Sequence, residues 1–253
     1  MSELTHLSLF SGIGGLDLAA EWAGFKTVGQ CEWADYPTKV LEQHWPDVPR
    51  WRDIRTLTKE SFYERTGLKT TDVISGGFPC QPHSKAGKRK ASNDERDLWP
   101  EMRRVIGEIG PKWVVAENVR GLLSSEDGRF FRGILRDFSD MGYDVGWGCI
   151  RAVDVGAIHR RERMGIIAHS RSRRFVGGWP KIDRVEWYKQ TFYDIDSSLE
   201  TWGGECNTFE PKLLRSYDGI PYWMDRIKCL GNAVCPPQFY PFFQIIADIE
   251  RSK

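Results

Sequence analysis

The sequence has no excess of charge of either sign, since its 253 residues include 36 Lys and Arg against 35 Asp and Glu. A balanced total does not exclude nucleic acid as a partner, because local patches set the field at a binding surface. The chain also lacks an apolar run of about 18 residues, so we expect no membrane span. Its first residues lack the charged and long apolar segments of a secretory signal. From these absences we expect a globular cytoplasmic protein.

Cysteine is scarce and never closely paired. The six cysteines are Cys31, Cys80, Cys149, Cys206, Cys229 and Cys235, and no two of them form a CxxC pair. A long cytosolic chain with scattered cysteines is expected to keep them reduced. Cys80 and His83 form a lone C-x-x-H without a second Cys or His pair, so we predict no metal site. Cys80 therefore remains either a nucleophile or an ordinary buried thiol at this point.

Short apolar runs alternate with segments of helical periodicity over the first 170 residues. Strands are predicted at 6–10, 26–33, 72–78, 113–119 and 164–170, and an apolar stripe predicts a final helix over 240–250. This alternation is typical of an α/β protein with a mostly parallel sheet and helices on both faces. The length suits one large domain, alone or with a small added lobe.

The periodicity stops between 171 and 212, where basic residues gather near the start of the segment. We interpret this segment as a small irregular lobe. The predicted organisation is therefore one catalytic domain formed by 1–170 and 213–253, with the last helix packed back onto it, and a separate lobe at 171–212.

A glycine-rich turn, FSGIGG, separates the first predicted strand from the first helix. Glycine permits close backbone approach, and a helix N-terminus attracts electron-rich ligand groups. The spacing is not GxGxxG, so the turn alone could be a tight α/β connection. Glu32 and Trp33 end the second strand, and Asp53 follows the third. Ligands of open α/β sheets bind where strands end, so these residues indicate a cofactor that contains a nucleoside.

Four further polar residues are predicted at the same edge of the sheet. Cys80 and Glu117 lie where two strands end, and Arg161 and Arg163 precede the last strand. One thiol, one carboxylate and two guanidinium groups would meet there.

These motifs in this order resemble the DNA (cytosine-5)-methyltransferase family. In this chain they read LFSGIGGLDL, CEW, GGFPCQPHS, AENVRG, HRRERMGIIA and LGNAVCPPQ. Each motif is weak alone, whereas all six in one order are specific, and they cover nearly the whole chain except 171–212. The resemblance implies the fold of S-adenosylmethionine-dependent methyltransferases, S-adenosylmethionine as cofactor and no metal.

The resemblance also assigns catalytic roles. Cys80 would add to carbon 6 of cytosine, because a thiolate can break the ring's aromaticity and activate carbon 5. Glu117 would bond ring nitrogen 3 and the exocyclic amine. Arg163 would contact the cytosine carbonyl oxygen, and Arg161 would orient or neutralise Glu117.

The cofactor residues carried over by motif come from both ends of the chain. They are Phe10, Gly12, Gly14, Leu16, Glu32, Trp33, Asp53, Ile54, Pro79, Asn232 and Val234. Phe10 and Trp33 would flank adenine, Glu32 would bond the ribose, and Asp53 would bond the adenine amino group.

The target cytosine must be flipped out, because duplex DNA buries carbon 6 in the base stack. The basic stretch after Cys80 is expected to close on the phosphates, and the basic residues after 170 to contribute to recognition. The candidate DNA contacts are Gln81, Ser84, Lys85, Lys88, Arg89, Arg171, Arg173 and Arg174. The same stretches could instead be solvated surface loops.

Three features depart from the family's usual pattern: His159 stands where Gln is common, Cys235 follows Gly-Asn-Ala-Val, and the recognition segment is short. Two alternatives remain: a tRNA cytosine-5 methyltransferase, and a non-catalytic DNA-binding homologue. For the main hypothesis we expect a monomer that acts on double-stranded DNA. A cognate restriction endonuclease acting on the same site, as in a restriction-modification pair, would be its partner.

Overall fold

The computed structural model describes residues 3–79, 97–157, 159–172 and 231–252. In this part of the chain, seven strands form one sheet in the order β3-β2-β1-β4-β5-β7-β6. The strands are β1 (Leu4–Leu9), β2 (Phe25–Cys31), β3 (Arg50–Trp51), β4 (Val73–Gly76), β5 (Trp113–Val119), β6 (Tyr143–Arg151) and β7 (Glu162–Ser170). The α-helices are α1 (Gly15–Trp22), α2 (Asp35–His44), α3 (Lys59–Thr66), α4 (Trp99–Ile109), α5 (Arg129–Asp140) and α8 (Pro236–Arg251). Short 3-10 helices are η1 (Ile54–Thr56), η2 (Arg120–Gly128) and η3 (Ala152–Val155).

The first five strands pair in parallel, and β7 runs antiparallel to both β5 and β6. The mostly parallel sheet predicted from the sequence is therefore confirmed. Because β7 runs in reverse, its first residues lie beside the last residues of β5, with Arg163 opposite Val119. We call the edge where β1, β2, β4 and β5 end, and where β7 begins, the carboxyl edge.

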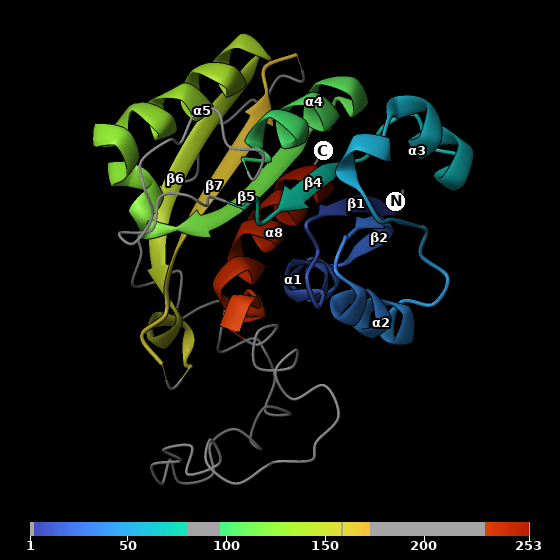
Figure 1. Cartoon of the computed structure of the whole chain (residues 1–253), viewed down its shortest axis with the longest axis horizontal. Helices are drawn as coiled ribbons and strands as arrows, with labels where there is room; N and C mark the ends of the chain where they lie inside the picture. The colour runs from blue at the N-terminus through green and yellow to red at the C-terminus, as the bar shows by residue number, and fades with distance from the viewer. Residues whose placement is uncertain (1–2, 80–96, 158, 173–230, 253) are drawn as a thin grey trace, which may run out of the picture.

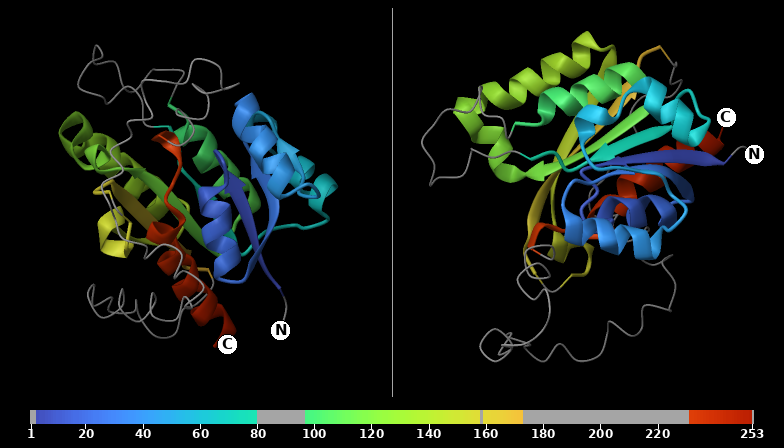
Figure 2. Two further views of the ribbon diagram at one scale, coloured as in Figure 1. Left: turned by 90° about the horizontal axis from the view of Figure 1, so that it is seen from below. Right: turned by 45° about the vertical axis from the view of Figure 1, so that its right-hand side comes forward.

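Helices cover both faces of the sheet. Figure 1 shows α4 and α5 on one face and α1 and α8 on the other, and the turned views of Figure 2 agree. Successive residues of β5 point to opposite faces of the sheet. Val114 packs in the core under α4 and α5, and Val115 packs in the core under α1 and α8. This alternation is the reason why the central strands are apolar at nearly every position.

The last helix packs beside the first, although more than 200 residues separate them in sequence. The rings of Trp22 and Tyr240 lie with their centroids 6.3 Å apart, and Arg251 donates to the carbonyl of Ala23 at 3.1 Å. A Cβ atom at Gly15 would lie 2.5 Å from the carbonyl oxygen of Val234, so only glycine permits this approach. The C-terminal segment thereby reaches the first residue of α1.

Helix α3 was not expected from the sequence. It is short and buries only Phe62 among its residues, so it has almost no apolar periodicity. Local chemistry forms it instead: Thr58 and Ser61 bond each other's backbone N–H groups in a capping box, and Gly67 ends the helix in the left-handed region. Helix α8 also begins earlier than predicted, because Pro236 and Pro237 suit a first turn.

No helix within the described ranges is long and apolar enough to cross a membrane. Nearly all of the predicted recognition lobe lies outside the described residues, so the division of the chain into a domain and a lobe stays a prediction.

Candidate active site at the carboxyl edge

The turn after β1 holds a strained backbone. Phe10 adopts a φ of 52°, which is uncommon for a residue with a side chain, and Gly12 and Gly14 have φ values of 56° and 88°. Gly14 is the N-cap of α1, and Leu16 is buried in its first turn. The space that a Cβ at Gly12 would occupy is open, with no described atom within 4 Å. Strain of this kind gathers at sites that bind ligands.

Glu32 connects this turn to the end of β2. Its carboxylate accepts hydrogen bonds from the backbone N–H groups of Gly12 and Ala34, both at 2.8 Å. Trp33 beside it leaves 80% of its surface exposed. A carboxylate held by backbone groups next to an open indole face is a suitable arrangement for a ribose and a base.

Asp53 and Ile54 lie just past β3. The Asp53 carboxylate caps η1 by accepting from the N–H of Arg55 at 2.9 Å, and its side chain is 43% exposed. Ile54 is buried. The turn therefore presents one carboxylate to the carboxyl edge from an anchored backbone.

An ion pair joins β5 and β7 at this edge. The Nε atom of Arg163 lies 2.8 Å from Oε1 of Glu117, and both side chains are more than four-fifths buried. Burial raises the pKa of the Glu117 carboxyl, and the charges of Arg163 and Arg161 oppose that shift without cancelling it. Glu117 is thus more readily protonated than an ordinary glutamic acid, which suits a group that bonds a ring nitrogen.

Arg161 makes its described hydrogen bond with the C-terminal segment rather than with Glu117. Its Nη1 donates to the carbonyl of Gly231 at 2.6 Å, while Arg163 makes the ion pair with Glu117. Gly165 of β7 lies directly opposite Glu117. Arg163 is two residues from Gly165 and Arg161 is four, so Arg163 lies nearer to the carboxylate. Arg161 acts on Glu117 through its charge, and burial lowers the pKa of its own guanidinium. Its Nε and Nη2 are buried and find no acceptor in the described part of the chain.

The segment that leads to Cys80 is held against β5. Asn118 is buried, donates from Nδ2 to the carbonyl of Phe78 at 3.0 Å, and accepts from the N–H of Val119. A Cβ at Gly77 would lie only 2.8 Å from Oε2 of Glu117. Sequence reasoning did not include Asn118, although it stands in the AENVRG motif.

Cys80 itself lies outside the described residues, and Pro79 is the last described residue before it. The same holds for most of the candidate DNA contacts: Gln81, Ser84, Lys85, Lys88, Arg89, Arg173 and Arg174.

Arg171 is the one candidate DNA contact that falls within the described residues. Its guanidinium donates to the carbonyl of Ser139, and its N–H donates to the carbonyl of Gly142. Since β7 is antiparallel, its last residues lie where β5 begins, at the opposite edge from Glu117. The sequence did not reveal this, because the direction of β7 depends on its pairing. Arg171 therefore lies away from the carboxyl edge, and its expected contact with DNA stays a prediction.

The C-terminal candidates lie in the segment just before α8. Asn232 is exposed, one residue after Gly231, and Val234 is half-buried beside the first turn of α1. Cys235 is half-buried. Across the described ranges, no group of three or more His, Cys, Asp or Glu side chains could hold a metal ion.

The strand order and the groups gathered at the carboxyl edge define the fold class as that of S-adenosylmethionine-dependent methyltransferases. The family model for C-5 cytosine-specific DNA methylases matches residues 4–213, and the chain belongs to this family.

Two curated relatives illustrate the likeness. The Type II methyltransferase M.NgoMIV of Neisseria gonorrhoeae is 34% identical over 81% of this chain and 64% of its own length. The Type II methyltransferase M.BsuFI of Bacillus subtilis is 34% identical over 88% of this chain and 53% of its own length. The chain thus spans about half to two thirds of the length of these relatives.

Solved structures share the fold. A candidate DNA modification methyltransferase encoded within an E. coli prophage has a TM-score of 0.59 and 28% identity, over 67% of this chain and 47% of that one. The Dnmt2 methyltransferase of S. pombe has a TM-score of 0.56 over 70% of this chain and 53% of that one. At 22% identity, the second likeness concerns the fold alone.

Proposed function

We propose that this chain transfers a methyl group from S-adenosylmethionine to carbon 5 of a cytosine flipped out of duplex DNA, at a short specific sequence. The observation that carries the proposal is the buried pair of Glu117 and Arg163, with Nε and Oε1 2.8 Å apart. It lies beside the segment that precedes Cys80, at the edge where Glu32 and Asp53 also lie.

In the proposed reaction, the Cys80 thiolate adds to carbon 6 of the cytosine. Electron density moves toward carbon 5 and ring nitrogen 3, where Glu117 stabilises it by a hydrogen bond. Arg163 holds the Glu117 carboxyl in place and bonds the cytosine carbonyl oxygen. S-adenosylmethionine, when bound, would supply the methyl group that carbon 5 accepts and would leave as S-adenosylhomocysteine. Loss of the proton from carbon 5 then expels Cys80 as a thiolate and restores the aromatic ring.

The turn and strand ends at the carboxyl edge support the cofactor part of the proposal. Gly12 leaves open space above the turn, and the Glu32 carboxylate is already oriented by two backbone donors. The exposed indole of Trp33 offers a flat surface for adenine. Phe10, Gly14, Leu16, Ile54, Pro79, Asn232 and Val234 complete the proposed set of cofactor-binding residues.

A trapping experiment tests the reaction. Long DNA of mixed sequence is synthesised with 5-fluorocytosine in place of cytosine and incubated with the protein and S-adenosylmethionine. Fluorine at carbon 5 cannot leave as a proton does, so Cys80 stays attached after methylation. We expect a covalent adduct for the wild type and none for Cys80→Ala, which should still bind S-adenosylhomocysteine. Methyl transfer to ordinary DNA without an adduct on the fluorinated DNA would overturn the Cys80 mechanism.

The substrate is tested by labelling duplex DNA and total tRNA side by side with a radioactive methyl donor. Label in DNA at carbon 5 of cytosine supports the proposal, and label in tRNA alone supports the tRNA alternative. Binding to DNA without label in either would support the non-catalytic homologue.

The names of the curated relatives support a setting for the proposed activity. Both are called Type II methyltransferases. We propose double-stranded DNA as the partner, a cognate restriction endonuclease that recognises the same sequence, and the bacterial cytoplasm as the compartment. Methylome sequencing of a host that expresses the chain would identify that sequence.

A further inference from the structure

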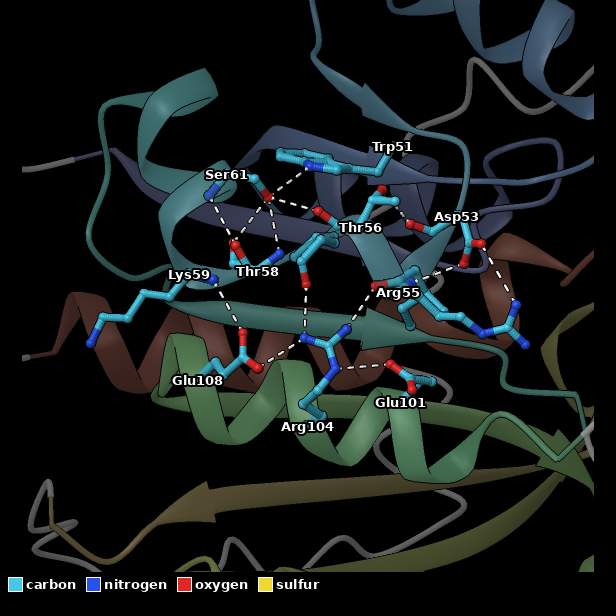
Figure 3. Close-up of polar contacts among 12 residues, drawn as sticks. Trp51, Asp53, Arg55, Thr56, Thr58, Lys59, Ser61, Glu101, Arg104 and Glu108 are labelled. Carbon is cyan, nitrogen blue, oxygen red and sulfur yellow. Dashed lines mark hydrogen bonds and ion pairs between the residues drawn. The ribbon is translucent and has the colours of Figure 1, made fainter. Parts of the chain in front are cut away.

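Helix α4 presents a polar face to the turn that carries Asp53. Glu101, Arg104 and Glu108 lie three and four residues apart, so they share one side of the helix. In Figure 3 Arg104 and Glu108 point toward the chain segment between Asp53 and Lys59, and Glu101 points toward Arg104. These side chains are about two thirds or more buried, and sequence reasoning assigned none of them a role.

Arg104 donates hydrogen bonds to backbone carbonyls at the two ends of η1. Its Nη2 donates to the carbonyl of Ile54 at 2.8 Å, and its Nη1 donates to the carbonyl of Leu57 at 3.1 Å (Figure 3). A guanidinium group has several donors in a rigid plane and can hold two carbonyls at once, whereas a lysine ammonium is a single flexible point of charge.

Two carboxylates hold the guanidinium in this orientation. Glu101 accepts from its Nε at 2.8 Å, and Glu108 accepts from its Nη1 at 2.9 Å. Burial opposes the charge, but the bonds to Glu108 and Glu101 outweigh it and raise the pKa of Arg104. Glu108 also accepts from the N–H of Lys59 at the start of α3. The Asp53–Lys59 segment is thus held from outside along its length.

The internal bonds of the turn are short-range, and the side chains of Ile54 and Leu57 anchor it in the core. η1 is three residues long. Its internal support is the Asp53 cap, the bond from the Thr56 hydroxyl to the Asp53 carbonyl at 2.7 Å, an Arg55–Asp53 ion pair at 3.7 Å and single-turn backbone bonds. The hydrogen-bond geometry of 3-10 turns is poorer than that of α-helices. The bonds from Arg104 to the Ile54 and Leu57 carbonyls therefore add, from outside, to what fixes the backbone that carries the Asp53 carboxylate.

We propose that Arg104 is a positioning residue for the adenine end of the cofactor site, acting from α4 through the carbonyls of Ile54 and Leu57. The inference rests on the proposed function, in which Asp53 bonds the adenine amino group and Ile54 belongs to the cofactor-binding set. Arg104 makes no contact with the cofactor itself. Its removal should weaken cofactor binding and leave the chemistry at Cys80 and Glu117 intact.

The test compares Arg104→Met with a matched control, Arg103→Met. Arg103 is the next residue of the same helix and pairs instead with Asp137 at 3.1 Å. We expect Arg104→Met to raise the Kd for S-adenosylhomocysteine, measured by calorimetry, by about tenfold. The KM for S-adenosylmethionine should rise in parallel, with kcat at saturation within about twofold, because only ground-state binding is lost. Arg103→Met should match the wild type.

Arg104→Lys provides the conservative comparison, and it replaces the Met variant if that variant does not fold. Lysine keeps the charge but lacks the planar guanidinium group that bonds two carbonyls at once. The Kd of this variant should therefore lie between those of the wild type and Arg104→Met. A wild-type Kd in both Arg104 variants would overturn the inference. A wild-type protein that does not bind S-adenosylhomocysteine would instead overturn the proposed function.

A double-mutant cycle separates positioning from general loosening of the fold. If Arg104 acts through the Asp53 turn, Arg104→Met should weaken binding much less in an Asp53→Ala background, because the oriented carboxylate is already gone. An equal loss in both backgrounds would show that Arg104 does not act through Asp53 and would overturn the inference.

Discussion

Glu117 and Arg163 form an ion pair across strands that run in opposite directions, with Arg163 Nε 2.8 Å from Glu117 Oε1. The residue directly opposite Glu117 is Gly165, and Arg163 is the diagonal neighbour two residues before it on β7. The absence of a side chain at that position leaves the carboxylate to its diagonal neighbour. The pair therefore depends on the register of β5 and β7.

Replacing Arg163 by Met should disable the proposed reaction. Glu117 would remain buried without its ion pair, and its already raised pKa would rise further. We expect kcat to fall by at least about 100-fold, while the Kd for S-adenosylhomocysteine changes little. Arg120→Met is the control, since Arg120 pairs with Glu162 at the surface and such pairs contribute little. A kcat near wild type for Arg163→Met would contradict the proposed role.

Gly77→Ala should displace the Glu117 carboxylate. The added Cβ would lie 2.8 Å from Oε2, so either the side chain or the β4 end must move. We expect activity to fall by about tenfold or more, with an overpacking cost of about 1–3 kcal/mol. Gly148→Ala is a matched control within the sheet, because no described atom lies within 4 Å of its Cβ position. Radioactive methyl transfer and chemical denaturation measure the two effects, and equal behaviour of both variants would contradict this prediction.

Gln238→Leu should loosen the attachment of α8 to the sheet. The buried Gln238 amide donates to the carbonyls of Ile150 and Arg161, at 2.8 and 3.0 Å. Losing this donor should lower the free energy of unfolding by about 1–3 kcal/mol in urea titrations. The control Gln244→Leu removes an amide of the same helix that bonds only Tyr240 and Asp248 among described residues, and should cost about 0.5 kcal/mol or less. Equal stability losses would show that Gln238 has no special role.

Asp17→Asn should change how stability depends on pH. Asp17 is buried against Ser8 and Gln30, and burial raises its pKa from 3.8 to about 6. The folded protein keeps a proton that the unfolded chain releases in this interval. The stability that Asp17 contributes is therefore complete below pH 3.8 and is lost as pH rises through 6, by about 3 kcal/mol.

Asparagine does not titrate, so Asp17→Asn should gain about 3 kcal/mol relative to the wild type between pH 4 and 7. Denaturant titrations at a series of pH values measure this difference. Burial lowers the pKa of His6 to about 3, but that contribution is common to both proteins and cancels. A difference that does not vary with pH would contradict the predicted protonation of Asp17.

Much of the fold could be predicted from local pattern. The apolar run of β5 was predicted with its observed bounds, and the glycine turn marked the junction of β1 and α1. Helix α3 could not be predicted in this way, because it buries one side chain and depends on capping. The direction of β7 was also beyond local pattern, because it depends on pairing with β5 and β6, and this direction places Arg171 at the edge opposite Glu117.

The sequence by itself determined which chemical groups this protein carries and in what order, because motifs such as GGFPCQPHS and AENVRG are local strings. Only the tertiary structure decided which of those groups meet. The antiparallel β7 brings Arg163, rather than Arg161, to Glu117, and α4 brings Arg104 to the turn of Asp53. The physical reason is that hydrogen bonds and ion pairs act over about 3 Å. Strand register and helix packing set distances on that scale, and spacing along the chain does not.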